Sequence, residues 1–173
     1  MTEILEILKY ILPSAVVFAA AYYLLKLFLD NEQKKRQADI KAAGYKIITP
    51  IRLQAYERLV LLLERISPES LIMRMHKSEF TALQLQTSLI LSIREEFEHN
   101  LSQQVYISSQ AWEIIRNAKE DMIKLINTAA TKLNDNATSI ELSQKIFELS
   151  VSSDKMLTKS ALEYVKNEIR QVM

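Results

Sequence analysis

The sequence predicts an all-α protein in which a single N-terminal transmembrane helix precedes an antiparallel helical bundle. Gly44 is the only glycine among 173 residues, whereas the turns of β-sheets depend on glycine for positive φ angles. Leu, Ala, Glu, Lys and Gln are abundant, and all five rank high as helix formers. A nearly continuous apolar segment close to the N-terminus predicts the membrane helix.

The apolar segment YILPSAVVFAAAYYLLKLFL covers residues 10–29. Twenty residues at a helical rise of ~1.5 Å give about 30 Å, the thickness of a hydrocarbon core. The segment holds no Asp, Glu or His, the residues that usually mark ion paths, so we do not expect transport by this chain alone. Aromatic rings and long cations favour membrane interfaces, and on this basis we assign seven interface residues: Tyr10, Tyr22, Tyr23, Lys26, Lys34, Lys35 and Arg36.

Two other interpretations of this segment fit it less well. A cleaved signal peptide begins with a basic region, but here Glu3 and Glu6 outnumber Lys9. A buried core helix is rarely apolar on every face over four turns. We therefore predict a retained anchor, and the excess of cations after the segment places the N-terminus outside and the C-terminal body in the cytoplasm.

The predicted organisation has three parts: an anchor over residues 1–30, a polar juxtamembrane segment over 31–48, and a cytoplasmic bundle over 49–173. The juxtamembrane segment is expected to continue the anchor helix and to break near Gly44. A new helix should begin at Thr49 as N-cap, with Pro50 in the first helical position. The cations of this segment serve as a stop-transfer flank or contact anionic lipid headgroups.

Later elements follow from caps and apolar spacing. Ser67 and Pro68 start a short helix that ends near His76, and Ser78 is expected to cap the next one. Ser108 or Ser109 should cap a fourth helix. The loop at residues 134–139 (NDNATS) precedes a fifth helix, which the residues SVSSD at 150–154 should separate from the last. In the fourth helix, the apolar positions follow an eleven-residue repeat: Ala111, Ile114, Ala118, Met122, Leu125, Ala129 and Leu133.

Apolar residues between Ile51 and Ile66 cover more than half of the helix circumference. So wide an arc indicates a central core helix, or a helix that faces the body on one side and another subunit on the other. Trp112 is a core-edge residue or an interface anchor. Under the interface interpretation, the partner-binding residues are Arg52, Tyr56, Leu59, Leu63 and Trp112.

The residues give little support for catalysis, and we predict no enzyme, cofactor or metal site. Cysteine is absent and there is no glycine-rich phosphate loop. Glu96 and His99 have the Glu-x-x-His spacing of carboxylate metal bundles, but those need the motif twice. His76 and Glu79 have the reverse order. A net charge of +1 makes nucleic acid an unsuitable partner.

The stretch ITPIRLQAYERLVLLLERISPESLIMRM, with the anchor before it, resembles an uncharacterised family of small Bacteroidota membrane proteins. Those proteins pair one N-terminal span with a helical cytoplasmic domain, so the resemblance implies an inner-membrane protein and no catalytic residue. A second likeness, to the peripheral-stalk b subunit of ATP synthase, is superficial. We reject it because Pro50, Pro68 and several helix caps are expected to break the single long helix that a stalk needs.

These observations predict a non-enzymatic accessory or scaffold subunit of a cytoplasmic-membrane protein complex. Its partners would be the lipid bilayer and other membrane-protein subunits, as a homo- or hetero-oligomer. The alternative is a membrane-tethered sensor that binds a small ligand between its helices, which a cavity in the bundle would favour. A metal-dependent oxidase is a third and weaker possibility.

Overall fold

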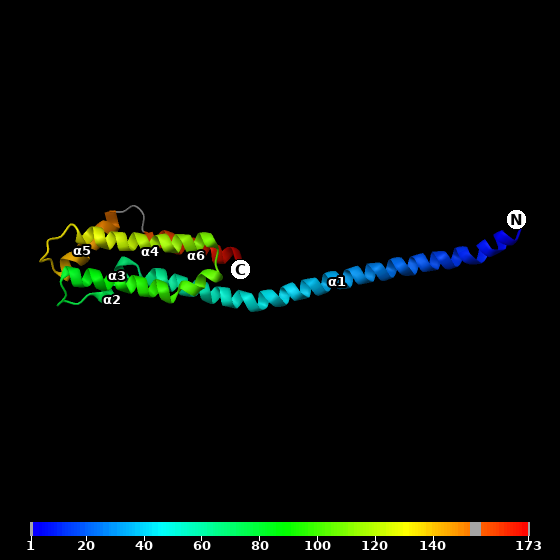
Figure 1. Cartoon of the computed structure of the whole chain (residues 1–173), viewed down its shortest axis with the longest axis horizontal. Helices are drawn as coiled ribbons and strands as arrows, with labels where there is room; N and C mark the ends of the chain where they lie inside the picture. The colour runs from blue at the N-terminus through cyan, green and yellow to red at the C-terminus, as the bar shows by residue number, and fades with distance from the viewer. Residues whose placement is uncertain (1, 153–156, 173) are drawn as a thin grey trace. The chain divides into compact units, whose positions relative to one another are not determined.

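The computed structural model describes residues 2–152 and 157–172, and this part contains six α-helices and no strand (Figure 1). The prediction of an all-α protein with a long N-terminal helix and a helical bundle is confirmed. The chain divides into two compact units, Met1–Ile48 and Thr49–Met173. The first helix, α1 (Thr2–Arg65), contributes residues to both.

The break that we predicted near Gly44 is wrong, because α1 is continuous through Gly44, Thr49 and Pro50. A single glycine costs a helix only about 1 kcal/mol, and good helix formers flank this one. Pro50 leaves the carbonyl of Lys46 without its helical donor, but both residues are exposed, so water can satisfy that oxygen. The expected break at Pro50, one of our reasons for rejecting a stalk-like helix, is therefore wrong, whereas the break before Pro68 is confirmed.

The remaining elements belong to the second unit. They are α2 (Pro68–Met75), α3 (Ala82–His99), the 3₁₀ helix η1 (Leu101–Val105), α4 (Ser109–Ala130), α5 (Ser139–Ser152) and α6 (Leu157–Val172). Helix α4 packs against α3, α5 and α6, and α2 packs against α3 and α5. Helix α5 extends further than predicted, through Ser152, and the rest of the expected interruption, Ser153 and Asp154, lies outside the described residues.

Helix starts in the bundle are set by local hydrogen bonds. Ser108 caps α4 by accepting from Ala111 N at 3.0 Å, one of the two caps expected. Helix α3 begins three residues later than expected, because Thr81 rather than Ser78 is its N-cap. Thr81 Oγ1 accepts from Gln84 N at 3.2 Å and Gln84 Oε1 accepts from Thr81 N at 3.0 Å, which forms a capping box.

The core of the second unit surrounds the last turns of α1. Leu59, Leu62 and Ile66 are at most 1% exposed and pack with the buried faces of α2–α6. The buried residues of α4 follow an eleven-residue repeat, as predicted, but at two positions of the repeat the fully buried residues are Ile115 and Ile126. Ile114 and Leu125, which we predicted there, are half-buried beside them.

Candidate functional site: an exposed apolar helix and the clusters of the bundle

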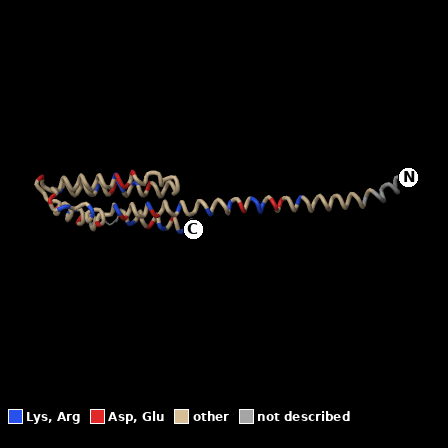
Figure 2. Tube along the Cα trace, turned by 90° about the horizontal axis from the view of Figure 1, so that it is seen from below, with Lys and Arg blue, Asp and Glu red and all other residues tan. Residues whose placement is uncertain are grey.

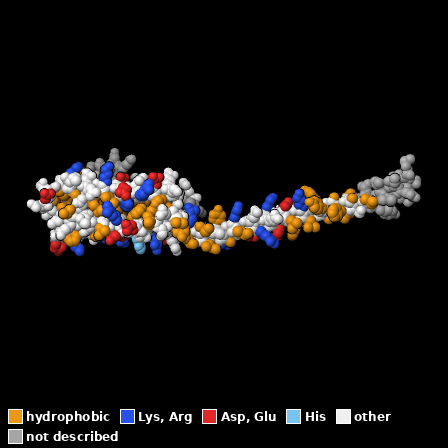
Figure 3. Space-filling view, in the orientation of Figure 1, with side chains coloured by type: hydrophobic (Ala, Val, Ile, Leu, Met, Phe, Trp, Pro, Cys, Tyr) orange, Lys and Arg blue, Asp and Glu red, His pale blue; other side chains and the backbone are white. Residues whose placement is uncertain are grey.

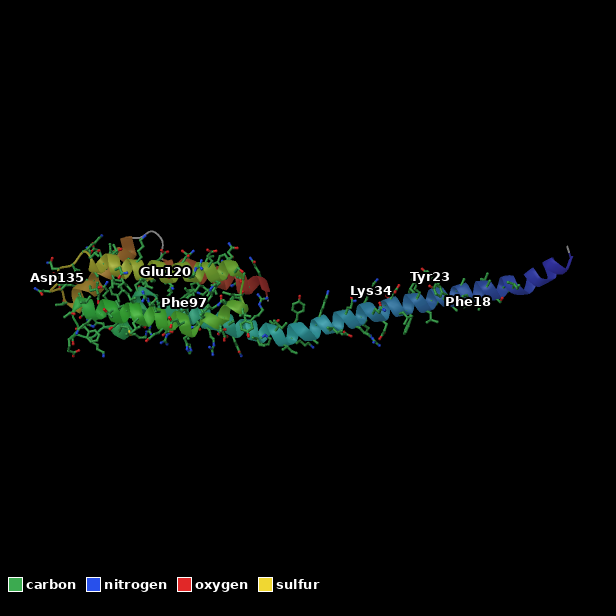
Figure 4. The ribbon with its side chains drawn as sticks, in the orientation of Figure 1. Phe18, Tyr23, Lys34, Phe97, Glu120 and Asp135 are labelled. Atoms are coloured by element: carbon green, nitrogen blue, oxygen red, sulfur yellow. The ribbon has the colours of Figure 1, made fainter. Side chains whose placement is uncertain are left out.

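In the first unit, the apolar side chains of α1 that the structure describes are exposed rather than covered by other elements. Phe18 is 74% exposed and Tyr23 is 66% exposed, and Figure 4 shows both projecting from the helix. The helix is long and apolar enough to cross a membrane, and none of its apolar window is buried. A core helix of a soluble domain would be mostly buried, so this exposure argues against that alternative.

Six of the seven residues assigned to the membrane interface lie toward the C-terminal end of this apolar stretch or beyond it, and Tyr10 begins the stretch. Tyr22, Tyr23 and Lys26 are exposed, and Lys34, Lys35 and Arg36 form an exposed cationic group one to two turns beyond Leu29 (Figure 2). The Nε atom of Arg36 donates to Glu32 Oε1 at 3.3 Å. The side chain of Tyr10 lies outside the described side chains.

Beyond the cationic group, α1 carries a second set of exposed apolar side chains that we did not single out. Ile40 is 72% exposed, Ile47 is 67% exposed and Ile48 is 53% exposed, and Figure 3 shows apolar side chains on this stretch. Ile40 and Ile47 are seven residues apart, so they lie on one face of the helix, with Ile48 beside Ile47. We call these three residues the juxtamembrane face. The spacing of these residues in the sequence is the feature from which this face could have been predicted.

Three of the five predicted partner-binding residues are core residues instead. Tyr56 and Leu63 are 1% exposed and Leu59 is fully buried, so each contacts the other helices of its own unit. The interpretation of the wide arc as a central core helix accounts for them. The remaining exposed apolar residues of this arc are Ile51, Leu53 and Leu61.

The other two predicted partner-binding residues reach the surface in part. Arg52 is half-buried, and its Nε donates to the carbonyl of Tyr106 at 3.1 Å. Trp112 is half-buried and stacks on Phe97 with ring centroids 5.0 Å apart. The ammonium of Lys119 lies 4.5 Å from the centroid of the Phe97 ring on α3. The structure therefore does not bring Trp112 together with Leu59 and Leu63 on one surface.

A polar cluster joins α1, the start of α4 and α6. The hydroxyl of Tyr56 donates to Glu168 Oε1, and Ser108 Oγ donates to Glu168 Oε2 at 2.6 Å. Ser108 N also donates to Glu168 Oε1, at 3.2 Å. One carboxylate therefore links a core tyrosine to the N-cap of a neighbouring helix, which sequence spacing could not indicate because the residues are far apart in the chain.

This cluster shifts the pKa values of both of its titratable members. Burial, then the hydrogen bond to the Glu168 carboxylate and its negative charge, raise the pKa of Tyr56 to about 12. For Glu168, burial acts to raise the pKa, but the hydrogen bonds from Ser108 and Tyr56 and the charge of Arg52 outweigh it, so the pKa is lowered. The cluster keeps Tyr56 neutral and Glu168 ionised, which suits a structural link.

His76 and the Glu96 carboxylate of the Glu-x-x-His motif both contact side chains from other elements of the bundle. Ser139 Oγ lies 3.3 Å from His76 Nε2, beside the paired backbones of Thr81 and Thr138. Glu96, which forms the Glu-x-x-His motif with His99, accepts from Arg65 Nε at 2.6 Å and from Arg74 at 3.2 Å. Among the residues that the structure describes, no three His, Cys, Asp or Glu side chains are grouped to hold a metal ion.

The bundle also contains a cavity of about 190 Å³. Its floor is formed by Leu63, Met122 and Leu162, which are at most 9% exposed. Phe147 and Leu125 add half-buried apolar walls. Thr158 is a buried polar residue of the lining, 8% exposed. The other polar side chains lie at the rim and come from α1, α2, α5, α6 and the α1–α2 connection: Glu64, Ser67, Glu69, Ser150 and Lys159.

Taken together, these features define a helical protein with one exposed apolar N-terminal helix and a separate bundle. The chain belongs to the family of unknown function DUF7935, which matches residues 2–172. The resemblance to an uncharacterised family is confirmed to that extent. No curated protein and no solved structure matches the sequence.

Proposed function

We propose that the protein is a non-enzymatic accessory or scaffold subunit of a membrane protein complex. The apolar part of α1 would span the cytoplasmic membrane, and the cations from Lys34 to Arg36 favour a bundle on the cytoplasmic side. The supporting observation is the juxtamembrane face, where Ile40 and Ile47 are exposed outside the apolar segment. Large exposed apolar side chains on one helix face are typical of an interaction surface.

Charge substitution on the juxtamembrane face tests this proposal. The variant Ile40→Glu with Ile47→Glu should lose the partner subunits that co-purify with the full-length protein from native membranes after crosslinking. The bundle should remain folded, because both residues lie in the other unit and are exposed. Ala38→Glu with Ala42→Glu adds the same charge on the opposite face and should keep the partners.

Two outcomes would contradict the proposal. The wild-type protein, released from native membranes in mild detergent, would run as a monomer without stoichiometric partners or further copies. Alternatively, both charge variants would retain the same partners as the wild type, so that the juxtamembrane face would have no role in the association.

The second candidate function is a membrane-tethered module that binds a small ligand, and the cavity in the bundle favours it. Protein interiors pack closely, and voids larger than a water molecule are few. A cavity of about 190 Å³ with an apolar floor and a polar rim has the composition of a ligand site. Native mass spectrometry of protein purified from its host should detect a bound small molecule; protein that carries none and has no affinity for any apolar probe would count against this function.

A further inference from the structure

We propose that the cavity of the bundle binds a small amphiphile with an amine head group and an apolar body of about six carbons. This inference rests on the second candidate function and names its ligand class. The size follows from the cavity, since an engineered apolar cavity of about 150 Å³ accepts benzene, and this one measures about 190 Å³.

The apolar body would occupy the floor of the cavity. Leu63 and Met122 are 1% exposed and Leu162 is 9% exposed, and all three line the cavity. An alkyl group placed against them leaves water, and the burial of its apolar surface favours binding. A polar body would lose its hydrogen bonds with water there and find apolar neighbours.

The rim selects the head group because its polar atoms are mostly hydrogen-bond acceptors. The hydroxyl of Ser67 donates to the carbonyl of Glu64 at 2.7 Å, and that of Ser150 donates to the carbonyl of Phe147 at 2.8 Å. Both hydroxyl oxygens therefore offer lone pairs to a ligand rather than a proton. The ligand's head group should accordingly donate hydrogen bonds.

The charges at the rim favour a cation over an anion. Among the described residues, the cavity is lined by two carboxylates, from Glu64 and Glu69, and by one ammonium, from Lys159. An alkylammonium can donate to the carboxylates and the hydroxyls, whereas a carboxylate ligand would meet two like charges and one opposite charge. An alcohol can donate but gains no charge attraction, so its affinity should be intermediate.

The measured quantity is the shift of the NMR signals of methionine methyl groups. The full-length protein in lipid nanodiscs, with ¹³C-labelled methionine methyls, is titrated with hexylamine, 1-hexanol and hexanoate. Met122 lines the cavity, whereas Met73 is 83% exposed and does not. The Met122 signal, assigned with Met122→Leu, should shift and saturate most readily with hexylamine, and Met73 should report general partitioning.

One matched pair of variants and one double variant make the test specific. Val151→Phe places a larger side chain at the exposed rim, where folding should tolerate it, and should abolish the saturable shift. Val105→Phe, at a similarly exposed position outside the cavity, should not. Glu64→Gln with Glu69→Gln should weaken hexylamine about three- to ten-fold, as expected for exposed ion pairs, and leave hexanol unchanged.

The outcomes separate the ligand class from the ligand-binding function itself. Equal or tighter binding of hexanoate would overturn the amine assignment and leave a ligand site in place. A Met122 shift that never saturates, or that follows Met73 in every titration, would overturn both. The accessory-subunit proposal is unaffected by either result, because it depends on the juxtamembrane face of the other unit.

Discussion

The link between Tyr56 and Glu168 allows a quantitative test through a double-mutant cycle. Tyr56 is 1% exposed, and its hydroxyl donates to the Glu168 carboxylate. A hydrogen bond to a charged group contributes about 1.5–3 kcal/mol. Glu168 keeps two further hydrogen bonds, from Ser108 N and Oγ, when the hydroxyl is removed. We therefore expect Tyr56→Phe to lower the free energy of unfolding by about 1–2 kcal/mol, toward the lower end of that range.

The same substitution should have a different effect once the carboxylate is gone. In the Glu168→Ala background the buried Tyr56 hydroxyl loses this acceptor, and an unsatisfied buried polar group costs about 1–3 kcal/mol. Removing the hydroxyl then relieves that cost. Tyr56→Phe should consequently be neutral or stabilising in this background, although it is destabilising in the wild type.

Trp112 is the only tryptophan in the sequence and provides the signal. It stacks on Phe97 within the second unit, so its fluorescence should report unfolding of the bundle while the apolar part of α1 stays in a nanodisc. Urea unfolding of the wild type, both single variants and the double variant gives the four free energies. If Tyr56→Phe costs the same in both backgrounds, within about 0.5 kcal/mol, the two side chains are not coupled and the described cluster does not stabilise the fold.

Three further predictions concern the core, the tyrosine and the anchor. Leu59→Ala should cost about 2–5 kcal/mol in urea unfolding, because the residue is fully buried, whereas Leu61→Ala at a 56% exposed position should cost less than about 0.5 kcal/mol. The folded-state pKa of Tyr56 is raised to about 12, so the contribution of Tyr56 to stability is complete below pH 10 and is lost as the pH rises toward 12. Tyr56→Phe should remove that part of the alkaline loss of stability. An unchanged dependence of stability on pH would contradict the assignment. Val17→Lys places a charge in the middle of the apolar segment at a cost of about 2.5–3.5 kcal/mol on insertion scales, so less protein should reach the membrane fraction; undiminished recovery there would argue against a spanning helix.

Composition and spacing were sufficient for much of the fold. The near absence of glycine predicted an all-α chain, and Ser67 with Pro68 located the start of α2 correctly. The break at Gly44 was predicted wrongly because glycine and proline were treated as stop signals. Their actual cost is a few kcal/mol, which a helix can bear where its backbone is exposed to water and its flanks are good helix formers. The cap of α3 was misplaced although Thr81 and Gln84 carry a readable capping-box pattern.

Functional residues were harder to predict than helices. The wide arc of α1 was compatible with a core helix or with an interface, and periodicity gives the direction of a side chain without saying what covers it. Only the packing of α2–α6 around Leu59 and Leu63 decided that these residues are internal. Ile40 and Ile47 also have a helical spacing. They differ from the buried residues only because no other element among the described residues covers them.

The sequence by itself determined the helical class, the apolar segment of α1 and the cations that follow it, because these depend on residues adjacent in the chain or one turn apart. Tertiary structure decided the Tyr56–Glu168–Ser108 cluster and the cavity between α1, α2, α4, α5 and α6, since their members are brought together only when distant helices pack. Contacts across a core depend on how the shapes of all the side chains that fill it fit together, and no local sequence pattern specifies that fit.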